Sequence, residues 1–258
     1  MLTDQEKESR ILEKYNINIK FWEELSPDLA YILGFIAGDG CFKIFGKQKL
    51  IQFPSIDIEI LEKIKIMAGL NHKIYCQKPK KESCKPLYIL TIKNRTICNL
   101  LQNKWNIHPR KTWNQGDYSY VLPYFRDFLR GFLDTDGCIG VYKFKGEKST
   151  PKINCYFSGV DGVFIKWIYN TIIKETNLKG VFYRYPKIKN KSLNYSINFR
   201  GIKAYKLLQY IYYDSEDKIL SLKRKRDIFE NYQTKEDNNA WTLRYKGTSK
   251  QAVLGLLS

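Results

Sequence analysis

Two related stretches of the 258-residue sequence decide the fold: ILGFIAGDG at Ile32–Gly40 and LRGFLDTDG at Leu129–Gly137. Each is an apolar segment that ends in Asp-Gly, with a further glycine at the same place inside it. The match continues downstream, where Phe53–Asp57 resembles Phe157–Asp161. The two copies are offset by 97 residues at the helices and by 104 residues downstream, a change that an insertion in a loop explains. Such self-similarity indicates two copies of one structural unit of about 100 residues. The sequence therefore predicts a pseudo-dimer within a single chain.

Each unit is predicted to have the order αββαββα. Ser26-Pro27-Asp28 is a favourable helix start, with a capping Ser, Pro at the first position and an acid in the first turn. This helix should run to Gly38 and be buried, because it is apolar nearly all round. Periodicity then predicts strands at Cys41–Phe45 and Leu50–Phe53, a helix at Asp57–Met67, strands at Lys73–Gln77 and Tyr88–Ile92, and a helix at Thr96–Gln102. An α+β fold follows, with helices on one face of each sheet and the other face open.

The charge of the chain points to a polyanionic partner. Lys and Arg number 44 against 26 Asp and Glu, which leaves a net charge of +18. Nucleic acid is the commonest partner of so basic a folded chain. A basic surface that is merely solvated is the alternative, since an AT-rich genome would also enrich Lys.

Several function classes are excluded by composition. An aromatic content of 15% favours a folded core over intrinsic disorder. The longest uncharged apolar stretch, Leu29–Gly38, is about half the length of a membrane span. No two cysteines have the spacing of a zinc knuckle, and His72 and His108 are poorly placed as catalytic bases. No phosphate-binding loop motif supports nucleotide hydrolysis.

Gly34 and Gly131 occupy matching places inside the two apolar helices. Glycine within a helix costs about 1 kcal/mol relative to alanine, so its presence in both copies needs a reason. Close approach of two helix backbones is one such reason. We therefore expect the two helices to form the interface between the halves.

Two acids would lie together if these helices pack side by side. Asp39 and Asp136 end the two helices, where their carboxylates repel each other and are repelled by the helix dipoles. A divalent cation such as Mg²⁺ relieves this repulsion, and the carbonyls of Gly38 and Thr135 are natural additional ligands. The alternative is that each Asp only caps a turn with its following Gly.

Both segments resemble the signature helix of the LAGLIDADG homing endonucleases in their single-chain, two-motif form. The resemblance covers about residues 28–233. It implies two αββαββα repeats related by pseudo-two-fold symmetry, packed through the motif helices, each with an antiparallel β-saddle for DNA. We expect an N-terminal helical extension at 1–27, half-domains at 28–115 and 116–233, and a C-terminal tail at 234–258. Ile11, Ile17 and Phe21-Trp22 of the extension are expected to pack on the first unit.

The resemblance also implies roles for individual residues. Asp39 and Asp136 match the catalytic, metal-binding acids, and Gly38 and Thr135 match the positions that give carbonyls. Lys111 and Lys225 look like the basic residues near the scissile phosphates, where they stabilise charge or order water. Each lysine has an alternative interpretation as a solvated residue or a phosphate contact.

The chain departs from the family pattern at three places. Many relatives carry Gln, which orders water, where this chain has Ser55 and Gly159. Ala37 replaces the first acid of the motif, whereas the second copy keeps Asp134. Unequal halves predict an asymmetric site that cuts the two strands at different rates.

DNA would be read by the open sheet faces, because a β-ribbon fits the major groove. Strand alternation assigns Phe42 and Ile44 to the core. The side chains expected to face the DNA are Lys43, Phe45, Gln52, Tyr75, Gln77, Asn154, Tyr156, Arg184, Tyr195 and Asn198.

The predicted function is a monomeric, site-specific endodeoxyribonuclease that makes a Mg²⁺-dependent staggered break in a long asymmetric site and promotes homing of its intron or intein-like host element. Mn²⁺ is expected to substitute for Mg²⁺. Double-stranded DNA is the expected partner. One alternative is a maturase that binds intron RNA, and another is a non-catalytic DNA-binding protein on the same scaffold. The expected location is intracellular, in a bacterial or phage-infected cytoplasm or in an organelle, with no membrane association.

Overall fold

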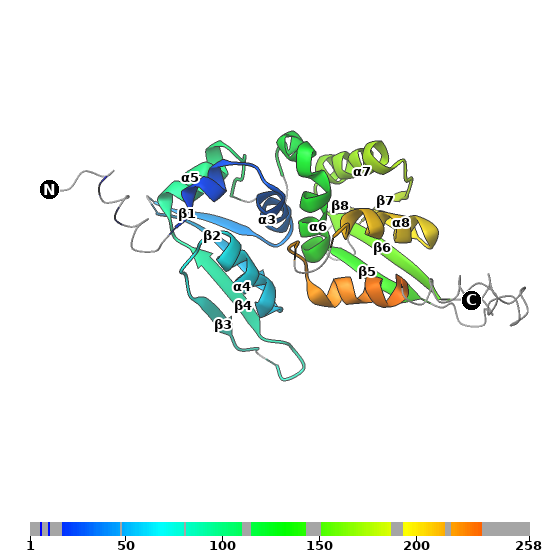
Figure 1. Ribbon diagram of the computed structural model, residues 1–258, viewed down its shortest axis with the longest axis horizontal. Helices are drawn as coiled ribbons and strands as arrows, with labels where there is room; N and C mark the ends of the chain where they lie inside the picture. The colour runs from blue at the N-terminus through cyan, green and yellow to red at the C-terminus, as the bar shows by residue number, and fades with distance from the viewer. Residues whose placement is uncertain are drawn as a thin grey trace, which may run out of the picture.

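The chain folds into two similar halves that meet at a central pair of helices, as the computed structural model shows (Figure 1). The structure describes Glu6, Arg10 and residues 17–46, 48–79, 81–109, 115–142, 151–186, 193–214 and 218–233. The first half contains α3 (Pro27–Gly38), β1 (Cys41–Phe45), β2 (Gln48–Ser55), α4 (Ile58–Met67), β3 (Ile74–Gln77), β4 (Leu87–Ile92) and α5 (Arg95–Asn103). The second half contains η2 (Ser119–Tyr124), α6 (Phe125–Asp136), β5 (Gly137–Tyr142), β6 (Lys152–Gly159), α7 (Gly162–Thr176), β7 (Val181–Pro186), β8 (Leu193–Arg200) and α8 (Ile202–Ile211). A further helix spans 223–233.

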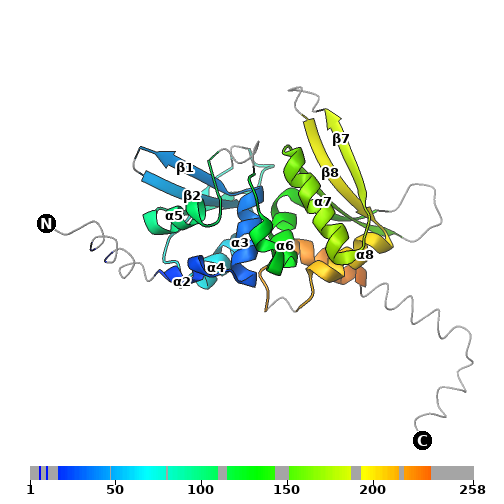
Figure 2. The same cartoon turned by 90° about the horizontal axis from the view of Figure 1, so that it is seen from above.

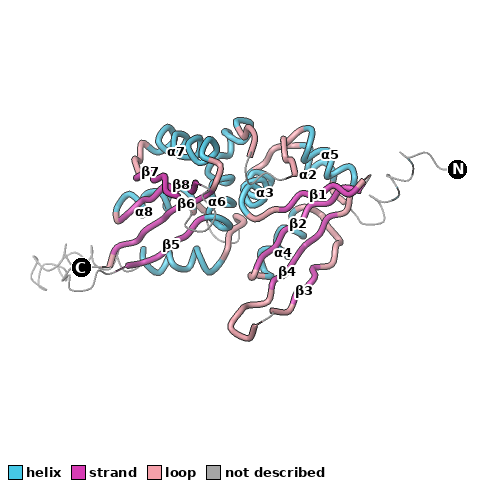
Figure 3. The backbone as a smooth tube through the Cα atoms, turned by 180° about the vertical axis from the view of Figure 1, so that it is seen from behind, coloured by secondary structure: helices cyan, strands magenta, loops and turns pink. Residues whose placement is uncertain are grey.

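The two sheets have the same topology, which confirms the predicted αββαββα repeat. The strand orders are β1-β2-β4-β3 and β5-β6-β8-β7, and all neighbours are antiparallel. Figure 3 shows the sheets as separate units on either side of α3 and α6. The fold is α+β, with two pseudo-symmetric halves in one chain.

Helix α3 begins and ends where its sequence predicts. The Ser26 hydroxyl accepts a hydrogen bond from the Leu29 amide at 3.2 Å, and Pro27 occupies the first helical position. Every residue from Leu29 to Ala37 is buried. Because apolar side chains cover the whole circumference, this helix is stable only when enclosed on all sides.

Helices cover one face of each sheet, and the core lies between them. Ile51 and Phe53 of β2 are fully buried on the helix side, as are Cys155 and Phe157 of β6. Phe42 is buried, as predicted, but the assignment of Ile44 to the core is wrong, because its side chain is 41% exposed. Ile44 lies on the same face of the sheet as Phe42, which is the face that the helices cover. It is exposed because it lies near the end of an edge strand, where the helices do not cover the sheet completely.

The N-terminal segment packs on the first half through α2 (Ile19–Glu23). Ile17 and Trp22 are buried, and Trp105 Nε1 donates a 2.6 Å hydrogen bond to the carbonyl of Trp22. The predicted packing is therefore confirmed for Ile17 and Trp22. Ile11 and the tail at 234–258 lie outside the described residues. None of the helices in the described part of the chain is long and apolar enough to cross a membrane.

A buried arginine ties α6 to the segments behind it. Arg130 is fully buried, and its guanidinium donates to the Asp127 carboxylate at 2.7 Å. It also donates to the carbonyls of Leu220 at 2.6 Å and Ile211 at 3.2 Å. These partners satisfy a charge that would otherwise be costly to bury, so the second half carries a polar network beneath its motif helix.

Cysteine burial gives a first test of this packing. Cys98 and Cys155 are buried, whereas Cys41, Cys76 and Cys84 are exposed. Burial raises the pKa of the Cys98 thiol to about 11. Because the thiolate is the reactive form, we expect the native protein to alkylate at the exposed cysteines at least about 100-fold faster than at Cys98 at pH 8. Mass spectrometry after timed iodoacetamide treatment measures this, with urea-unfolded protein as the control. Equal labelling of Cys98 in the native protein would contradict the described core.

Candidate functional site

Helices α3 and α6 lie side by side at the centre of the molecule and contact each other more extensively than any other pair of elements (Figure 2). A Cβ atom added to Gly34 would overlap the backbone carbonyl of Phe128. One added to Gly131 would overlap the carbonyl of Tyr31 and lie 2.8 Å from the nitrogen of Phe35. Only glycine permits so close an approach of two backbones. These two glycines therefore set the distance between the helices.

The ends of the two helices bring the predicted acids to neighbouring places. Asp39 is the C-cap of α3, and Asp136 is the last residue of α6. A Cβ atom added to Gly38 would overlap the Thr135 side chain and lie 3.4 Å from the Asp136 nitrogen. Asp39 is exposed and Asp136 is half-buried. Both acids thus leave the same junction between the halves.

A polar cavity opens beside this junction. Its volume is about 220 Å³, and its lining includes Gly38, Asp136, Gln115, Asp161 and Asn194. Asp161 caps α7, because its Oδ1 accepts from the amides of Val163 at 3.0 Å and Phe164 at 3.1 Å. The cavity is therefore rich in oxygen atoms and lies next to one of the two acids.

The donor set at the helix ends fits a hard divalent cation. Carboxylates of Asp39 and Asp136 and backbone carbonyls of Gly38 and Thr135 are the oxygen ligands that Mg²⁺ prefers. Within the described residues, no group of three His, Cys, Asp or Glu side chains forms a metal site by itself. Carbonyl, water or substrate oxygens would therefore complete the coordination.

Lys225 lies against the end of α6. It is buried, and its ammonium donates to the carbonyls of Leu133 at 2.6 Å, Asp134 at 2.8 Å and Gly137 at 2.7 Å. These bonds use all three N–H donors of a lysine. Burial lowers the pKa of Lys225, and the Asp134 carboxylate opposes that shift. Lys225 therefore lies close to Asp136, but its ammonium group is hydrogen-bonded to backbone carbonyls. Lys111 lies outside the described residues.

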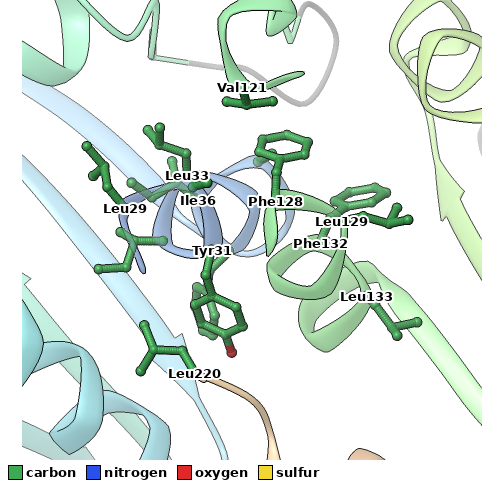
Figure 4. Close-up of a cluster of buried hydrophobic side chains, with 14 of the residues drawn as sticks. Leu29, Tyr31, Leu33, Ile36, Val121, Phe128, Leu129, Phe132, Leu133 and Leu220 are labelled. Carbon is green, nitrogen blue, oxygen red and sulfur yellow. The ribbon is translucent and has the colours of Figure 1, made fainter. Parts of the chain in front are cut away.

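Asp134 has a structural position beneath the junction. It is buried, and its Oδ2 accepts from the Tyr31 hydroxyl at 2.8 Å and the Leu222 amide at 2.7 Å. Figure 4 shows the Tyr31 ring pointing away from α3 toward Leu220. Burial raises the pKa of the Asp134 carboxyl. The matching residue of the first motif, Ala37, has no side chain that could form such bonds.

Five of the side chains predicted to face outward lie on the open face of the first sheet. Lys43 and Gln52 lie on the face away from the helices. The strand register shows this, because it pairs Lys43 with Leu50 and pairs Gln52 with both Cys41 and Thr91. Lys43 Nζ donates to Gln52 Oε1 at 2.8 Å, and Gln52 Nε2 donates to Thr91 Oγ1 at 3.2 Å. The same strand parity puts three further side chains on this face, and all are exposed: Phe45, Tyr75 and Gln77.

The second sheet carries tyrosine and amide side chains on its open face. Asn154 and Tyr156 of β6 lie there, and Tyr156 pairs with Asn198 of β8. The hydrogen bond with Cys138 raises the pKa of Tyr156 to about 12. The register adds residues that sequence reasoning missed: Tyr142, Tyr183, Tyr185, Asn194 and Arg200.

Arg184 and Tyr195 do not belong to this open face, so their predicted orientation is wrong. They pair directly across β7 and β8, and Tyr195 packs on the helix side against Phe182, with ring centroids 6.1 Å apart. Strand β7 alternates Phe182 inward with Tyr183 outward. Aromatic residues occupy both faces of β7. The sequence therefore predicts that side chains alternate between the two faces, but not which residues face the helices.

The two positions where the sequence lacks glutamine differ in environment. Ser55 Oγ accepts from the Asp57 amide at 3.0 Å, so its hydroxyl is engaged in a local turn. Gly159 lines the cavity beside Asp136. An added Cβ there would lie 2.9 Å from the Ile165 side chain. The halves are therefore unequal at this place.

Comparison with known proteins identifies the fold of this chain. No protein-family model matches the sequence, and no curated protein matches it. Among solved structures, the I-LtrWI LAGLIDADG homing endonuclease bound to target DNA matches 93% of this chain and 96% of its own, with a TM-score of 0.50 and 12% identity. The homing endonuclease I-WcaI bound to its DNA recognition sequence matches 82% of this chain and 91% of its own, with a TM-score of 0.51 and 15% identity. Together with the paired Asp-Gly helices and the two open sheets, these likenesses establish that the chain has the LAGLIDADG homing endonuclease fold in its single-chain, two-motif form.

Proposed function

We propose that this protein is a site-specific endonuclease of the LAGLIDADG class that makes a staggered, Mg²⁺-dependent break in double-stranded DNA. The observation that carries the proposal is the junction of α3 and α6, where Asp39 and Asp136 leave adjacent helix ends between two open sheets. The two structures similar to this chain are described as DNA complexes, which supports DNA as the partner. A net charge of +18 supports the same partner.

Each acid has a defined role in this proposal. Asp39 and Asp136 bind and orient a divalent cation, with the carbonyls of Gly38 and Thr135 as further ligands. A divalent cation held there would supply charge stabilisation and an activated water for hydrolysis of the phosphodiester. The two helix ends serve one strand each. Because the ends are adjacent, they would face two phosphates across the narrow minor groove, which are offset in sequence, and a short 3′ overhang would result.

Recognition is assigned to the open faces. Lys43 and Gln52 are joined by a hydrogen bond, which holds both side chains in place before DNA arrives. Asn154, Tyr156 and Asn198 form the corresponding polar surface of the second sheet. Amide and ammonium groups pair with base edges in the major groove, so sequence preference arises from these rows. Such an enzyme promotes homing of the element that encodes it.

Selection from a library of randomised duplexes tests the proposal. Cleaved molecules are recovered after incubation with Mg²⁺ or with EDTA, using the wild type and an Asp39→Asn/Asp136→Asn double variant. We expect metal-dependent recovery of one long asymmetric site by the wild type only. Mn²⁺ in place of Mg²⁺ should give the same site.

The other outcomes identify the competing functions. Cleavage that persists in EDTA or in the double variant would contradict the assigned acids. Tight, sequence-selective duplex binding without cleavage would indicate a non-catalytic DNA-binding protein. Selective binding to a structured intron RNA, with no duplex cleavage, would indicate a maturase.

A further inference from the structure

Four tyrosine side chains gather on the open face of the second sheet. Strands β5 and β6 contribute one each, and the edge strand β7 contributes two: Tyr142, Tyr156, Tyr183 and Tyr185. Each of these residues is at least 37% exposed. Folded proteins rarely leave large apolar groups together on one surface unless that surface binds a partner. These four residues, called the tyrosine face below, therefore need a binding role of their own.

The rings of the tyrosine face are held in place before any partner binds. Tyr142 lies over Gly140, because a Cβ atom added to this glycine would lie 2.7 Å from both the tyrosine hydroxyl oxygen and a ring carbon. The Tyr156 hydroxyl is hydrogen-bonded to Cys138, which is the largest cause of the raised pKa of this tyrosine. Tyr142 and Tyr185 also raise that pKa through their charges, so both lie near Tyr156. The face therefore presents neighbouring, oriented rings.

Asparagine side chains lie beside these rings on the same face. The strand register pairs Tyr156 with Asn198 and Tyr185 with Asn194. Asn154 is paired with the glycine that lies beneath the β5 tyrosine. Each of these three rings thus has an amide group next to it, which can donate and accept hydrogen bonds at once.

Charged side chains lie at the outer end of this face in the described part of the second sheet. Lys152 pairs with Tyr142, and Arg200 pairs with Asn154, far along β5 from its start at the end of α6. The described rows nearer to the junction carry uncharged residues on this face. They adjoin the acid, since Ser158 Oγ donates to the Asp136 carbonyl at 3.4 Å.

This combination of groups matches one kind of base pair. In the major groove the apolar group is the thymine methyl, and an amide side chain pairs with the adenine edge, so an A·T pair offers a partner to both. Guanine is read chiefly by Arg or Lys, which this face carries at its outer end. Exposed rings can also stack on unpaired bases. The amides beside the rings favour base edges, because stacking needs no hydrogen-bonding group.

We propose that the tyrosine face selects A·T base pairs, with the rings of Tyr142, Tyr156 and Tyr185 against thymine methyl groups and the neighbouring asparagines on adenine edges. This inference rests on the proposed function, and it names the class of sequence that the second half prefers. The half-site under the second sheet is A·T-rich next to the junction, and G·C pairs enter toward its outer end.

Replacing thymidine by deoxyuridine tests the methyl contacts directly, because the two nucleotides differ only in that methyl group. Duplexes recovered from the randomised library, by cleavage in Mg²⁺ or by binding in Ca²⁺, are resynthesised with deoxyuridine at one thymidine at a time. Binding is measured by titration in Ca²⁺. We expect each contacted position to bind about fourfold more weakly, which is the effect of losing one buried methyl group.

Variants assign these positions to the tyrosine face. In Tyr156→Ser, deoxyuridine at the position that this ring contacts should cause less than about a twofold further loss, because one contact can be lost only once. Tyr156→Phe keeps the ring and should keep the full sensitivity to the methyl group. Ile202→Ser is the control, since this exposed residue begins α8 on the covered side of the same half. It should respond to deoxyuridine as the wild type does.

The outcomes separate this inference from the proposed function. A duplex that is cleaved normally, and binds equally well with deoxyuridine at every thymidine, would overturn the A·T selection and leave the nuclease function standing. A G·C-rich half-site at the positions affected by Tyr156→Ser would do the same. Tighter binding to single-stranded oligonucleotides than to duplex would assign the rings to stacking and overturn both. If Tyr156→Ser fails to fold, Tyr142→Ser on the edge strand gives the same comparison.

Discussion

Cleavage by Asp136→Asn is expected to be about 10³-fold slower than by the wild type, with folding and DNA binding retained. Asparagine has nearly the same shape as aspartate but removes the negative charge at the end of α6 to which the proposed function assigns a divalent cation. A loss of metal-derived charge stabilisation in the transition state is worth several kcal/mol, which corresponds to this factor. Asp39→Asn should have an effect of similar size, because its carboxylate leaves the neighbouring helix end.

Single-turnover cleavage of the selected duplex measures this effect, with binding followed separately by gel shift in Ca²⁺. Asp117→Asn is the matched control, because Asp117 is exposed and an asparagine oxygen can still accept from the Ser119 amide. Its cleavage rate should stay within about twofold of the wild type. Wild-type cleavage by Asp136→Asn would remove that residue from the catalytic site.

Gly131→Ala should destabilise the protein by about 3–5 kcal/mol, although it adds only one methyl group. The added carbon would overlap the carbonyl of Tyr31, a backbone atom that no rotamer change can move. The helices must separate, and every contact along the α3–α6 interface weakens. Gly34→Ala should act similarly, through the carbonyl of Phe128.

Urea unfolding followed by circular dichroism measures this destabilisation. Val163→Ala is the control, because Val163 lies in the first turn of α7 and is 83% exposed. It should change the unfolding free energy by less than about 0.5 kcal/mol. Wild-type stability of both glycine variants would contradict the described approach of the helices.

Local signals were sufficient to predict much of the fold. The Ser26-Pro27 start and the apolar run to Gly38 gave the bounds of α3, because capping and periodicity act over short distances. The open face of the first sheet was predictable because polar and apolar residues alternate there. In β7 both faces carry aromatic residues, so the pattern was compatible with either phase, and Arg184 was assigned to the wrong side.

Long-range contacts were not predictable in the same way. Gln115 Nε2 donates to the Ala37 carbonyl across 78 residues of sequence, and nothing in its neighbourhood predicts this contact. The capping role of Asp161 is easier to predict, because an Asp before an apolar run is a helix-start signal. Its role in receiving the Gln115 amide depends on how the segment that follows α5 folds back.

The hydrogen bond from Tyr31 to Asp134 determines which halves can pair. In the repeat, Tyr31 matches Phe128 and Asp134 matches Ala37. Two copies of the first half would present two buried tyrosine hydroxyls without a carboxylate to receive them. Two copies of the second half would enclose two carboxylates, each facing a phenyl ring. Each Asp134 would keep the Leu222 amide of its own half but lose the tyrosine hydroxyl, so both mismatches remove a buried hydrogen bond that the mixed pairing makes. The halves, expressed as separate chains, would therefore assemble with each other and not with themselves.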